Sequence, residues 1–422
     1  MRKVKPIIIV IFVTFSLVTL ASSVTAQSYD FTVEGQNNPE QDIKAIQEAV
    51  DKGGVILLRG MFDLGDKGRV NFKKDVKVVG EMDNEKNPLT KIKRGFWSFH
   101  SPLPSKESPP EAPGPKITIQ GIHFDGAMWT PIFLAYTSGA DISNNKITNV
   151  IPFEIKRKWQ GGDSFWWQTG AVFGTQFINW KKTPFAGAVT GKLIFQKNNV
   201  DLKTEKPKVT LGQGVYYQLT WGADIEVREN VFTNVSRNSI ETLDNYLDKE
   251  GVGRVTIANN KIITPIEGCP FPGPSSYPNG IVTGWFHDMS GGMDPSRNSK
   301  ILILDNYVEI SAELANGIIS LGDEPVILNN KIVMKGGAKS KGIKQIGSNA
   351  YIANNKIEGS GEWAMQALTY KVLKGNGNTF AWNDTDNFKA FGSDYLCVGN
   401  NNTILGETSK VVDKGKGNTV LK

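Results

Sequence analysis

ILILDNYVEI (residues 301–310), PVILNNKIVM (325–334) and YIANNKIEGS (351–360) repeat one pattern, and this pattern decides the fold. Apolar and polar residues alternate in each stretch, as they do in a β-strand with one buried face. Each stretch also contains an Asn, one free residue and an aliphatic residue. Because a unit of about two dozen residues cannot bury its own apolar face, the copies must stack into a solenoid.

The repeat recurs through most of the chain. Its Asn is found at Asn145, Asn198, Asn230, Asn260, Asn306, Asn330, Asn355, Asn378, Asn402 and Asn418. Equivalent residues of neighbouring parallel coils lie about 4.8 Å apart. An Asn at one aligned bend can therefore hydrogen bond to the next coil, and it tolerates the left-handed backbone of such a bend. We expect these asparagines to be structural.

A second frame precedes several repeats, so each coil has at least two strands. It reads NSIETL, NGIVTG, NGIISL and KGIKQI, with its isoleucines at Ile240, Ile281, Ile318 and Ile343. The leucine-rich repeat frame is absent, and propeller blades would be about twice as long. The sequence predicts an all-β fold, a single-stranded right-handed parallel β-helix of about 10–12 coils. From about Asp42 to its end the chain resembles the pectin-lyase-like right-handed parallel β-helix superfamily.

The first 26 residues are predicted to be a secretory signal peptide. They combine a basic start, MRKVK, an apolar run, PIIIVIFVTFSLVTLA, and small residues before Gln27. The alternative is an uncleaved anchor, for which the run is short. We expect a secreted or periplasmic protein with no membrane span after signal removal. Three cations leave with the segment, so the formal charge falls from +6 to +3, and we expect no nucleic-acid partner.

Residues 27–54 are expected to cap the helix, which would occupy residues 55–422. Asn38 can cap a short α-helix that has Pro39 at its first position, and Gly53 can end it. The apolar stripe of this helix would be Ile43, Ile46 and Val50. A solenoid needs such a cap because the apolar end of its first coil is otherwise open to water.

Departures from the repeat length predict loop insertions near 83–115, 151–190 and 265–299. Loops carry function more often than the scaffold does. The second insertion contains Trp166 and Trp167, whose flat rings could stack on sugar rings. The alternative is that these rings pack the insertion against the barrel or form a small core of their own. Both interpretations stay open at this point.

Ionisable residues follow the second frame on successive coils. The candidate catalytic residues are Glu241, Asp244, His287, Asp288 and Asp323. The candidate substrate-binding residues are Trp166, Trp167, Trp221, Arg237, Trp285 and Lys344. Trp221 and Trp285 could flank a groove, and Arg254 lies on or near the same coils. Carboxylates one or two coils apart would lie on the order of 5 to 10 Å from one another, a separation that suits glycoside hydrolysis. The same oxygens would suit Ca²⁺, and the imidazole of His287 can exchange protons near neutral pH.

These patterns predict an exported carbohydrate-active protein. We expect it to be a monomer that binds and cleaves an extracellular polysaccharide, as a lyase or a glycoside hydrolase, with Ca²⁺ as a possible cofactor. The alternative is a non-catalytic glycan-binding or adhesive surface β-helix protein. The catalytic motifs of polygalacturonases and pectate lyases are missing, so the resemblance transfers no catalytic residue. Exposed loop ends of any solenoid are polar, which is the structural reading of the acidic run.

Overall fold

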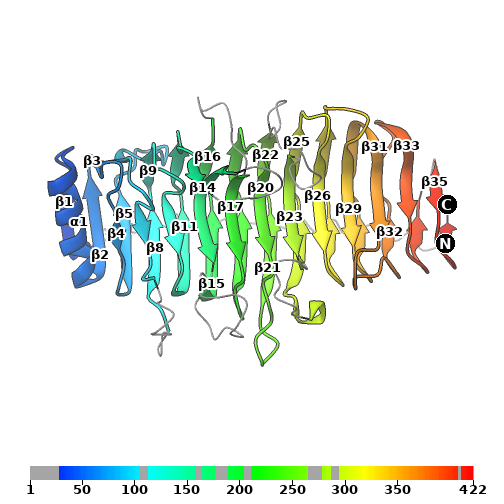
Figure 1. The fold of residues 1–422 in the computed structure, drawn as a ribbon, viewed down its shortest axis with the longest axis horizontal. Coiled ribbons are helices and arrows are strands. Elements are labelled where there is room, and N and C mark those ends of the chain that lie inside the picture. The colour runs from blue at the N-terminus through cyan, green and yellow to red at the C-terminus, as the bar shows by residue number, and fades with distance from the viewer. Residues whose placement is uncertain are drawn as a thin grey trace, which may run out of the picture.

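The predicted right-handed parallel β-helix is confirmed by a computed structural model of the chain (Figure 1). The structure describes residues 28–103, 113–156, 163–175, 189–203, 211–264, 278–286, 294–406 and 410–421, without the side chains of Phe165 and Thr175. Every coil contributes one strand to sheet A and then passes through sheet B, which consists of two ladders side by side. The predicted signal peptide, residues 1–26, lies outside the described residues.

Sheet A contains, in spatial order, β1 (Phe31–Glu34), β2 (Gly54–Arg59), β5 (Val76–Gly80), β8 (Lys116–Gln120), β11 (Thr137–Ser143), β15 (Val189–Gln196), β18 (Asp224–Arg228), β21 (Arg254–Ala258), β24 (Lys300–Leu304), β27 (Val326–Leu328), β30 (Tyr351–Ala353), β32 (Thr379–Ala381), β34 (Thr403–Leu405) and β36 (Thr419–Leu421). These are 14 strands. Without β1, which precedes the cap, and β36, the last described strand, twelve coils remain, within the predicted range.

The first ladder of sheet B contains β3 (Met61–Asp63), β6 (Thr90–Lys93), β9 (Ile122–Asp125), β12 (Lys146–Thr148), β16 (Asn199–Asp201), β19 (Val231–Thr233), β22 (Lys261–Thr264), β25 (Tyr307–Ile310), β28 (Lys331–Met334), β31 (Lys356–Leu368) and β33 (Phe388–Cys397). The second ladder contains β4 (Val70–Asn71), β7 (Phe99–His100), β10 (Ile132–Leu134), β14 (Phe165–Thr175), β17 (Leu211–Gln218), β20 (Asn238–Leu243), β23 (Asn279–Gly284), β26 (Asn316–Leu321), β29 (Lys341–Ile346), the later halves of β31 and β33, and β35 (Val411–Asp413).

The core lies inside the coils. Ile240, Ile281, Ile318 and Ile343 are paired in register on β20, β23, β26 and β29 and are fully buried. The residue before each of the last three is Gly, because a Cβ at Gly280 or Gly317 would lie within 2.6 Å of the next coil's backbone or of a core side chain. In the Asn-Gly-Ile frame, the Gly therefore lies where the backbone approaches the next coil closely, and the Ile after it lies in the core.

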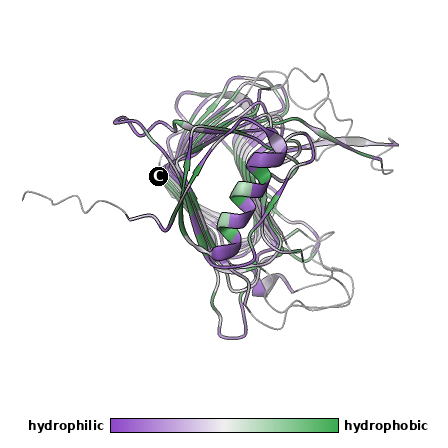
Figure 2. Cartoon of the chain, turned by 90° about the vertical axis from the view of Figure 1, so that its left-hand side faces the viewer, coloured by the Kyte–Doolittle hydropathy of each residue, from purple (hydrophilic) through white to green (hydrophobic). Residues whose placement is uncertain are grey.

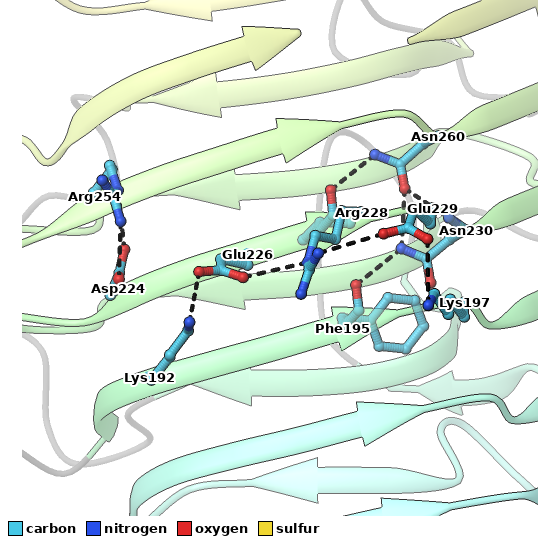
Figure 3. Close-up of polar contacts among 11 residues, drawn as sticks. Lys192, Phe195, Lys197, Asp224, Glu226, Arg228, Glu229, Asn230, Arg254 and Asn260 are labelled. Atoms are coloured by element: carbon cyan, nitrogen blue, oxygen red, sulfur yellow. Dashed lines mark hydrogen bonds and ion pairs between the residues drawn. The ribbon is translucent and has the colours of Figure 1, made fainter. Parts of the chain in front are cut away.

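The asparagine ladder is confirmed from Asn145 to Asn355. Each side-chain oxygen accepts from the backbone N–H and the side-chain amide of the preceding Asn, as at Asn230 and Asn260, 3.1 and 2.9 Å (Figure 3). The residue before each ladder Asn, and not the ladder Asn itself, takes the left-handed conformation; φ is 57° at Glu229 and 57° at Asn329. The bend needs one left-handed residue, and the amide that follows it then points inward.

The prediction that Asn378, Asn402 and Asn418 continue this ladder was wrong. Asn355 donates instead to Asn383, 2.9 Å away. The other three form a separate ladder at the bend that enters sheet A, where Asn378 donates to Asn402 and Asn402 to Asn418. The step of 23 residues from Asn355 to Asn378 resembles one coil only by coincidence, because it joins two different bends.

The capping helix α1 (Pro39–Lys52) forms as predicted and lies across the end of the coil stack (Figure 2). Asn38 accepts from the Gln41 N–H at 3.2 Å, and the helix ends at Gly53, whose φ is 80°. Ile46 and Val50 are fully buried against the first coil. The cap therefore covers the apolar end of the stack.

The segments expected as insertions contain strands of the coils as well as excursions. Residues 83–115 include β6 and β7, residues 151–190 include β14, and residues 265–299 include β23. Beyond the regular coil, β13 (Phe153–Ile155) pairs antiparallel with the start of β14, and a short helix, η1 (Pro295–Arg297), precedes β24.

Candidate functional site

One outward-facing position of the second ladder forms a row along the coils, and this row contains two of the predicted site residues, Glu241 and Lys344. Its neighbours in the strands, such as Val215 and Ile240, point into the core, and side chains alternate along a strand. The position is occupied, coil by coil, by His100, Phe133, Phe173, Tyr216, Glu241, Val282, Ile319, Lys344 and Gln366. Aromatic rings therefore lead along this side of the molecule to the carboxylate of Glu241.

The rings form two layers, which we call the aromatic face. The inner layer, Trp129, Phe133, Phe173 and Tyr216, is buried, and the outer layer, Phe96, Trp97, Phe153 and Trp167, is partly exposed. Ring centroids of Phe173 and Tyr216 are 4.8 Å apart, and those of Trp97 and Phe133 are 4.3 Å apart, in stacked geometry. Trp167, from the second predicted insertion, packs on the inner layer, with its ring centroid 5.2 Å from that of Trp129, and the outer layer presents ring surface to solvent.

Arg69 adds positive charge to the outer layer. Its guanidinium carbon lies 4.6 Å from the ring centroid of Phe96 and 4.5 Å from that of Trp97. The side chain is exposed and forms no ion pair with a carboxylate of the described residues. A guanidinium held flat on aromatic rings keeps its hydrogen-bond donors at the rim, where they can reach a polar ligand.

Trp167 connects the aromatic face to Glu241 through hydrogen bonds. Its indole N–H donates to Gln213 Oε1 at 2.7 Å, and Gln213 Nε2 donates to Glu241 Oε2 at 3.1 Å. The Asn238 amide donates to the same oxygen at 2.5 Å, and the Arg237 guanidinium lies 3.9 Å from it. Glu241 is 3% exposed, and its other oxygen, Oε1, has no hydrogen-bond partner among the described residues. One oxygen is thus fixed, and the described residues provide no donor to the other.

Asp244 lies three residues further on and is completely buried. It accepts hydrogen bonds from the Phe286 N–H at 2.8 Å, the Tyr246 hydroxyl at 3.2 Å and Gln218 Nε2 at 3.5 Å. Burial raises the pKa of Asp244 to about 7, although these hydrogen bonds favour the ionised form. Because no oxygen is open to solvent, Asp244 cannot touch a substrate and acts on the fold.

The predicted convergence of five acidic and imidazole groups is only partly seen. Asp323 does not join Glu241, because it lies exposed at the bend after β26, where its carboxylate accepts from the Ser348 N–H at 2.6 Å. His287 and Asp288 lie outside the described residues. Arg254 is on the opposite sheet, A, paired with Asp224 at 3.1 Å. The aligned frame places residues on neighbouring coils but does not decide which way the following bend turns them.

The predicted substrate-binding residues separate into groups. Trp167 and Arg237 contact the Glu241 cluster as described, whereas Trp166 faces the other side of β14, because neighbouring residues of a strand point to opposite sides. Trp285 is buried among apolar side chains that include Leu243. Trp221 packs 5.6 Å from the ring of Tyr246. Both tryptophans therefore pack on this apolar cluster, and that they flank a groove stays a prediction.

Lys344 lies on the same outward position as Glu241, three coils further along. At about 4.8 Å per coil this corresponds to roughly 14 Å. Burial, with a smaller contribution from Lys341, lowers the pKa of Lys344, and no carboxylate of the described residues pairs with it. An ammonium at this position can donate hydrogen bonds to an anionic or hydroxyl group of a ligand.

Sequence reasoning missed several residues of the site. Gln213, Trp97, Phe133 and Tyr216 lie in no copy of either repeat. Asn238 opens the NSIETL frame but is not among the predicted site residues. Their alternation with core residues would have indicated an outward position, but not that they share one position. Among the described residues, no group of three or more His, Cys, Asp or Glu could hold a metal ion. The described part of the chain also contains no helix long and apolar enough to cross a membrane.

Comparisons with known proteins identify no family for this chain. No protein-family model matches the sequence, and no curated protein matches it. The solved structures with some similarity include ORF18 of Geobacillus virus E2, a mannuronic acid specific polysaccharide family 6 lyase from human gut microbiota, and the A-module of the Azotobacter vinelandii mannuronan C-5 epimerase AlgE4.

These similarities are weak. The viral protein is 12% identical with a TM-score of 0.39, and the match covers 87% of this chain and 61% of that one. The lyase is 12% identical with a TM-score of 0.39 over 90% and 82%. The epimerase module is 10% identical with a TM-score of 0.34 over 87% and 99%. At such values the similarities say nothing about activity, and this chain spans less than two thirds of the viral protein.

Proposed function

We propose that this protein binds a polysaccharide along the outward side of the second ladder, over the aromatic face, and cleaves it beside Glu241. The observation that carries the proposal is the hydrogen-bonded connection from Trp167 through Gln213 to Glu241. It joins a partly exposed layer of rings, which can stack on the apolar faces of sugars, to a carboxylate with one open oxygen. Export through the signal peptide predicted over residues 1–26 is part of the proposal.

Glu241 is the carboxylate that the reaction would use. Two amide donors and the nearby Arg237 guanidinium hold one oxygen of Glu241 in place, an arrangement that suits a nucleophile or base. In glycoside hydrolysis such a carboxylate attacks the anomeric carbon or activates a water, while a second acid protonates the leaving oxygen. Asp244 is too enclosed to be that acid. His287, which lies outside the described residues, stays a candidate for it, as does Lys344 for substrate binding.

The direct test is incubation of the protein with a panel of neutral and uronic acid polysaccharides. Binding would be followed by affinity electrophoresis, and cleavage by the appearance of reducing ends and of ultraviolet-absorbing unsaturated ends. Unsaturated ends would identify a lyase, and reducing ends alone a hydrolase. We expect Glu241→Gln to abolish cleavage and keep binding, because the amide preserves the size of the side chain and removes its charge.

Two further variants separate binding from folding. Arg69→Ala and Trp97→Ala should weaken binding, whereas Phe391→Ala, which removes an exposed ring (53%) on β33, should not. Melting temperatures would show that each variant is folded. Cleavage that survives Glu241→Gln would remove Glu241 from the mechanism. Binding without cleavage would favour the alternative, a non-catalytic glycan-binding protein. No binding across the panel would overturn the proposal as a whole.

A further inference from the structure

The outward surface of sheet A changes character along the solenoid. On β15 and β18 it is charged, with Lys192 paired to Glu226 at 2.8 Å and Arg228 paired to the same carboxylate at 3.3 Å (Figure 3). From β24 to β36 the two rows that continue the positions of Glu226 and Arg228 are uncharged, whereas the position of Lys192 continues to Lys300 on β24, which pairs with Glu324. One row has Leu302, Val326 and Tyr351 and then threonines. The other has only Leu or Ala, and Ala353 and Ala381 in it are buried. We call these two rows, with the adjoining bend, the C-terminal strip.

The bend beside this strip carries an unusual residue. At the aligned left-handed position other coils have Asp305, Asn329 or Asn354, residue types that tolerate a positive φ, but the coil of β32 has Trp382 with φ 49°. The ring is 62% exposed. A bulky residue in this conformation is strained, and its exposed ring adds nothing to the core. Because neither the strained backbone nor the exposed ring stabilises the fold, Trp382 indicates a role in binding.

The neighbours of Trp382 leave its ring open. The next coil has Gly406 at the same position, and a Cβ there would come within 3.3 Å of the ring. On the other side, the Asn354 and Asn329 side chains are exposed and make no hydrogen bond to the described residues. Tyr351, 41% exposed, lies on the same strip one coil before β32. The surface therefore offers two rings, a line of free amides and threonine hydroxyls.

The dimensions of the strip favour a linear ligand over a protein. Six strands give five steps of about 4.8 Å, so the strip is about 24 Å long. Its two rows are two residues apart on each strand, about 7 Å. Even with side chains added, this area is far below the roughly 800 Å² that each partner buries in a stable protein interface. An extended chain of small rings, in contrast, covers such a strip from end to end.

We infer that the C-terminal strip is a second glycan-binding site, which takes a single chain of an uncharged polysaccharide. Sugar rings stack on Trp382 and Tyr351, and their hydroxyls bond to the amides of Asn354 and Asn329. The rows contain no cation to hold a uronate carboxylate, which selects a neutral chain. The site lies on sheet A, whereas the aromatic face and Glu241 lie on the second ladder of sheet B, so it goes beyond the proposed function.

The test uses the whole protein and three soluble neutral polysaccharides, mixed-linkage β-glucan, galactomannan and hydroxyethyl cellulose, in affinity electrophoresis with calorimetry on any that bind. Trp382→Asn places in the bend the residue type that neighbouring coils use there. It should therefore keep or raise the melting temperature and lower affinity about tenfold or more. Tyr351→Ala should weaken binding in the same way. Phe391→Ala, which removes an exposed ring of β33 that belongs to neither site, should leave the affinity for the strip's ligand unchanged.

Three outcomes would overturn the inference. They are no binding of the three polysaccharides, binding that Trp382→Asn leaves unchanged, and binding that Trp97→Ala abolishes. The last outcome would assign the neutral glycan to the aromatic face, so that the proposed function would stand and the second site would fall. If Trp382→Asn loses binding to the neutral polysaccharides and the aromatic face binds none of the polysaccharides tested, the second site would stand and the proposed function would fall.

Discussion

At the scale of single residues, Glu241 and Asp244 show how environment separates two carboxyl groups of the same strand end. Glu241 points outward and is held by amide donors from β17 and β20. Asp244, at a left-handed position with φ 54°, is enclosed by Tyr246, Gln218 and the Phe286 backbone. The same type of side chain therefore has a possible chemical role in one place and a structural one three residues away.

The buried Asp244 gives a pH dependence of stability. Its pKa is raised from 3.8 to about 7 in the folded protein, so between these values the native state holds a proton that the unfolded state has lost. Protonated Asp244 therefore stabilises the folded state at low pH, and this contribution to the free energy of unfolding is lost as the pH rises from about 4 to 7. We expect Asp244→Asn to remove this slope, making the variant relatively more stable at pH 7.5 than at pH 4.5. Urea unfolding across this range measures it.

Asp63 provides a matched control of opposite sign. Burial raises its pKa, but hydrogen bonds from Arg94 and the Gly65 N–H outweigh burial and lower it below 3.8. Its stabilisation is present above the unfolded pKa and lost in acid. Asp63→Asn should therefore be destabilising at pH 7 and lose that effect as the pH falls below about 4. If the free energy of unfolding depended on pH in the same way in wild type and in Asp244→Asn, the slope between pH 4 and pH 7 would not come from Asp244.

At the scale of elements, the asparagine ladder fixes the register of sheet A on the first ladder of sheet B. Asn306 is buried, accepts two hydrogen bonds from Asn260 and donates to Asn330, Ile257 and Leu304. Each coil thus contributes one amide that satisfies the backbone of two neighbours. The ladder is therefore a continuous element although its members are 24 to 53 residues apart in sequence.

We expect Asn306→Ala to lower the free energy of unfolding by about 1–3 kcal/mol, because buried donors on Asn260 and a buried acceptor on Asn330 lose their partner. Asn329→Gly is the control. Asn329 lies exposed one residue before a ladder Asn with φ 57°, and Gly tolerates that conformation, so stability should stay within about 0.5 kcal/mol of wild type. Urea denaturation compares the two. Equal costs for both changes would contradict a special role of the ladder position.

At the scale of the whole molecule, each coil contacts only its neighbours, so stability is a sum of local terms. The α1 cap matters because it closes one end (Figure 1). Asp42 ties this helix to the first coils by accepting from the N–H groups of Gln36, Asn38 and Asp63, at 2.8 to 2.9 Å. A change at Asp42 should therefore loosen one end and leave the other unaffected.

Asp42→Asn should cost about 1–3 kcal/mol, since the new NH₂ group faces backbone donors. Hydrogen exchange should rise in β2 and β5, next to the cap, and stay unchanged in β27 and β30. Asp51→Asn, a change to an exposed residue of the same helix, should have neither effect. Uniform loss of protection along the chain would mean that the solenoid unfolds as one cooperative unit instead.

The sequence by itself determined the repeat, the coil number, the inward isoleucine rows and the cap, because each depends on spacing within about two dozen residues. It also placed Glu241, Trp167 and Arg237 among the candidates. Only the tertiary structure decided that Gln213 joins Trp167 to Glu241, that Asp323 and Arg254 lie elsewhere, and that Asn378 belongs to another bend. The physical reason is that contacts between coils depend on register and on the direction of each bend, and neither is written in the local alternation of residues.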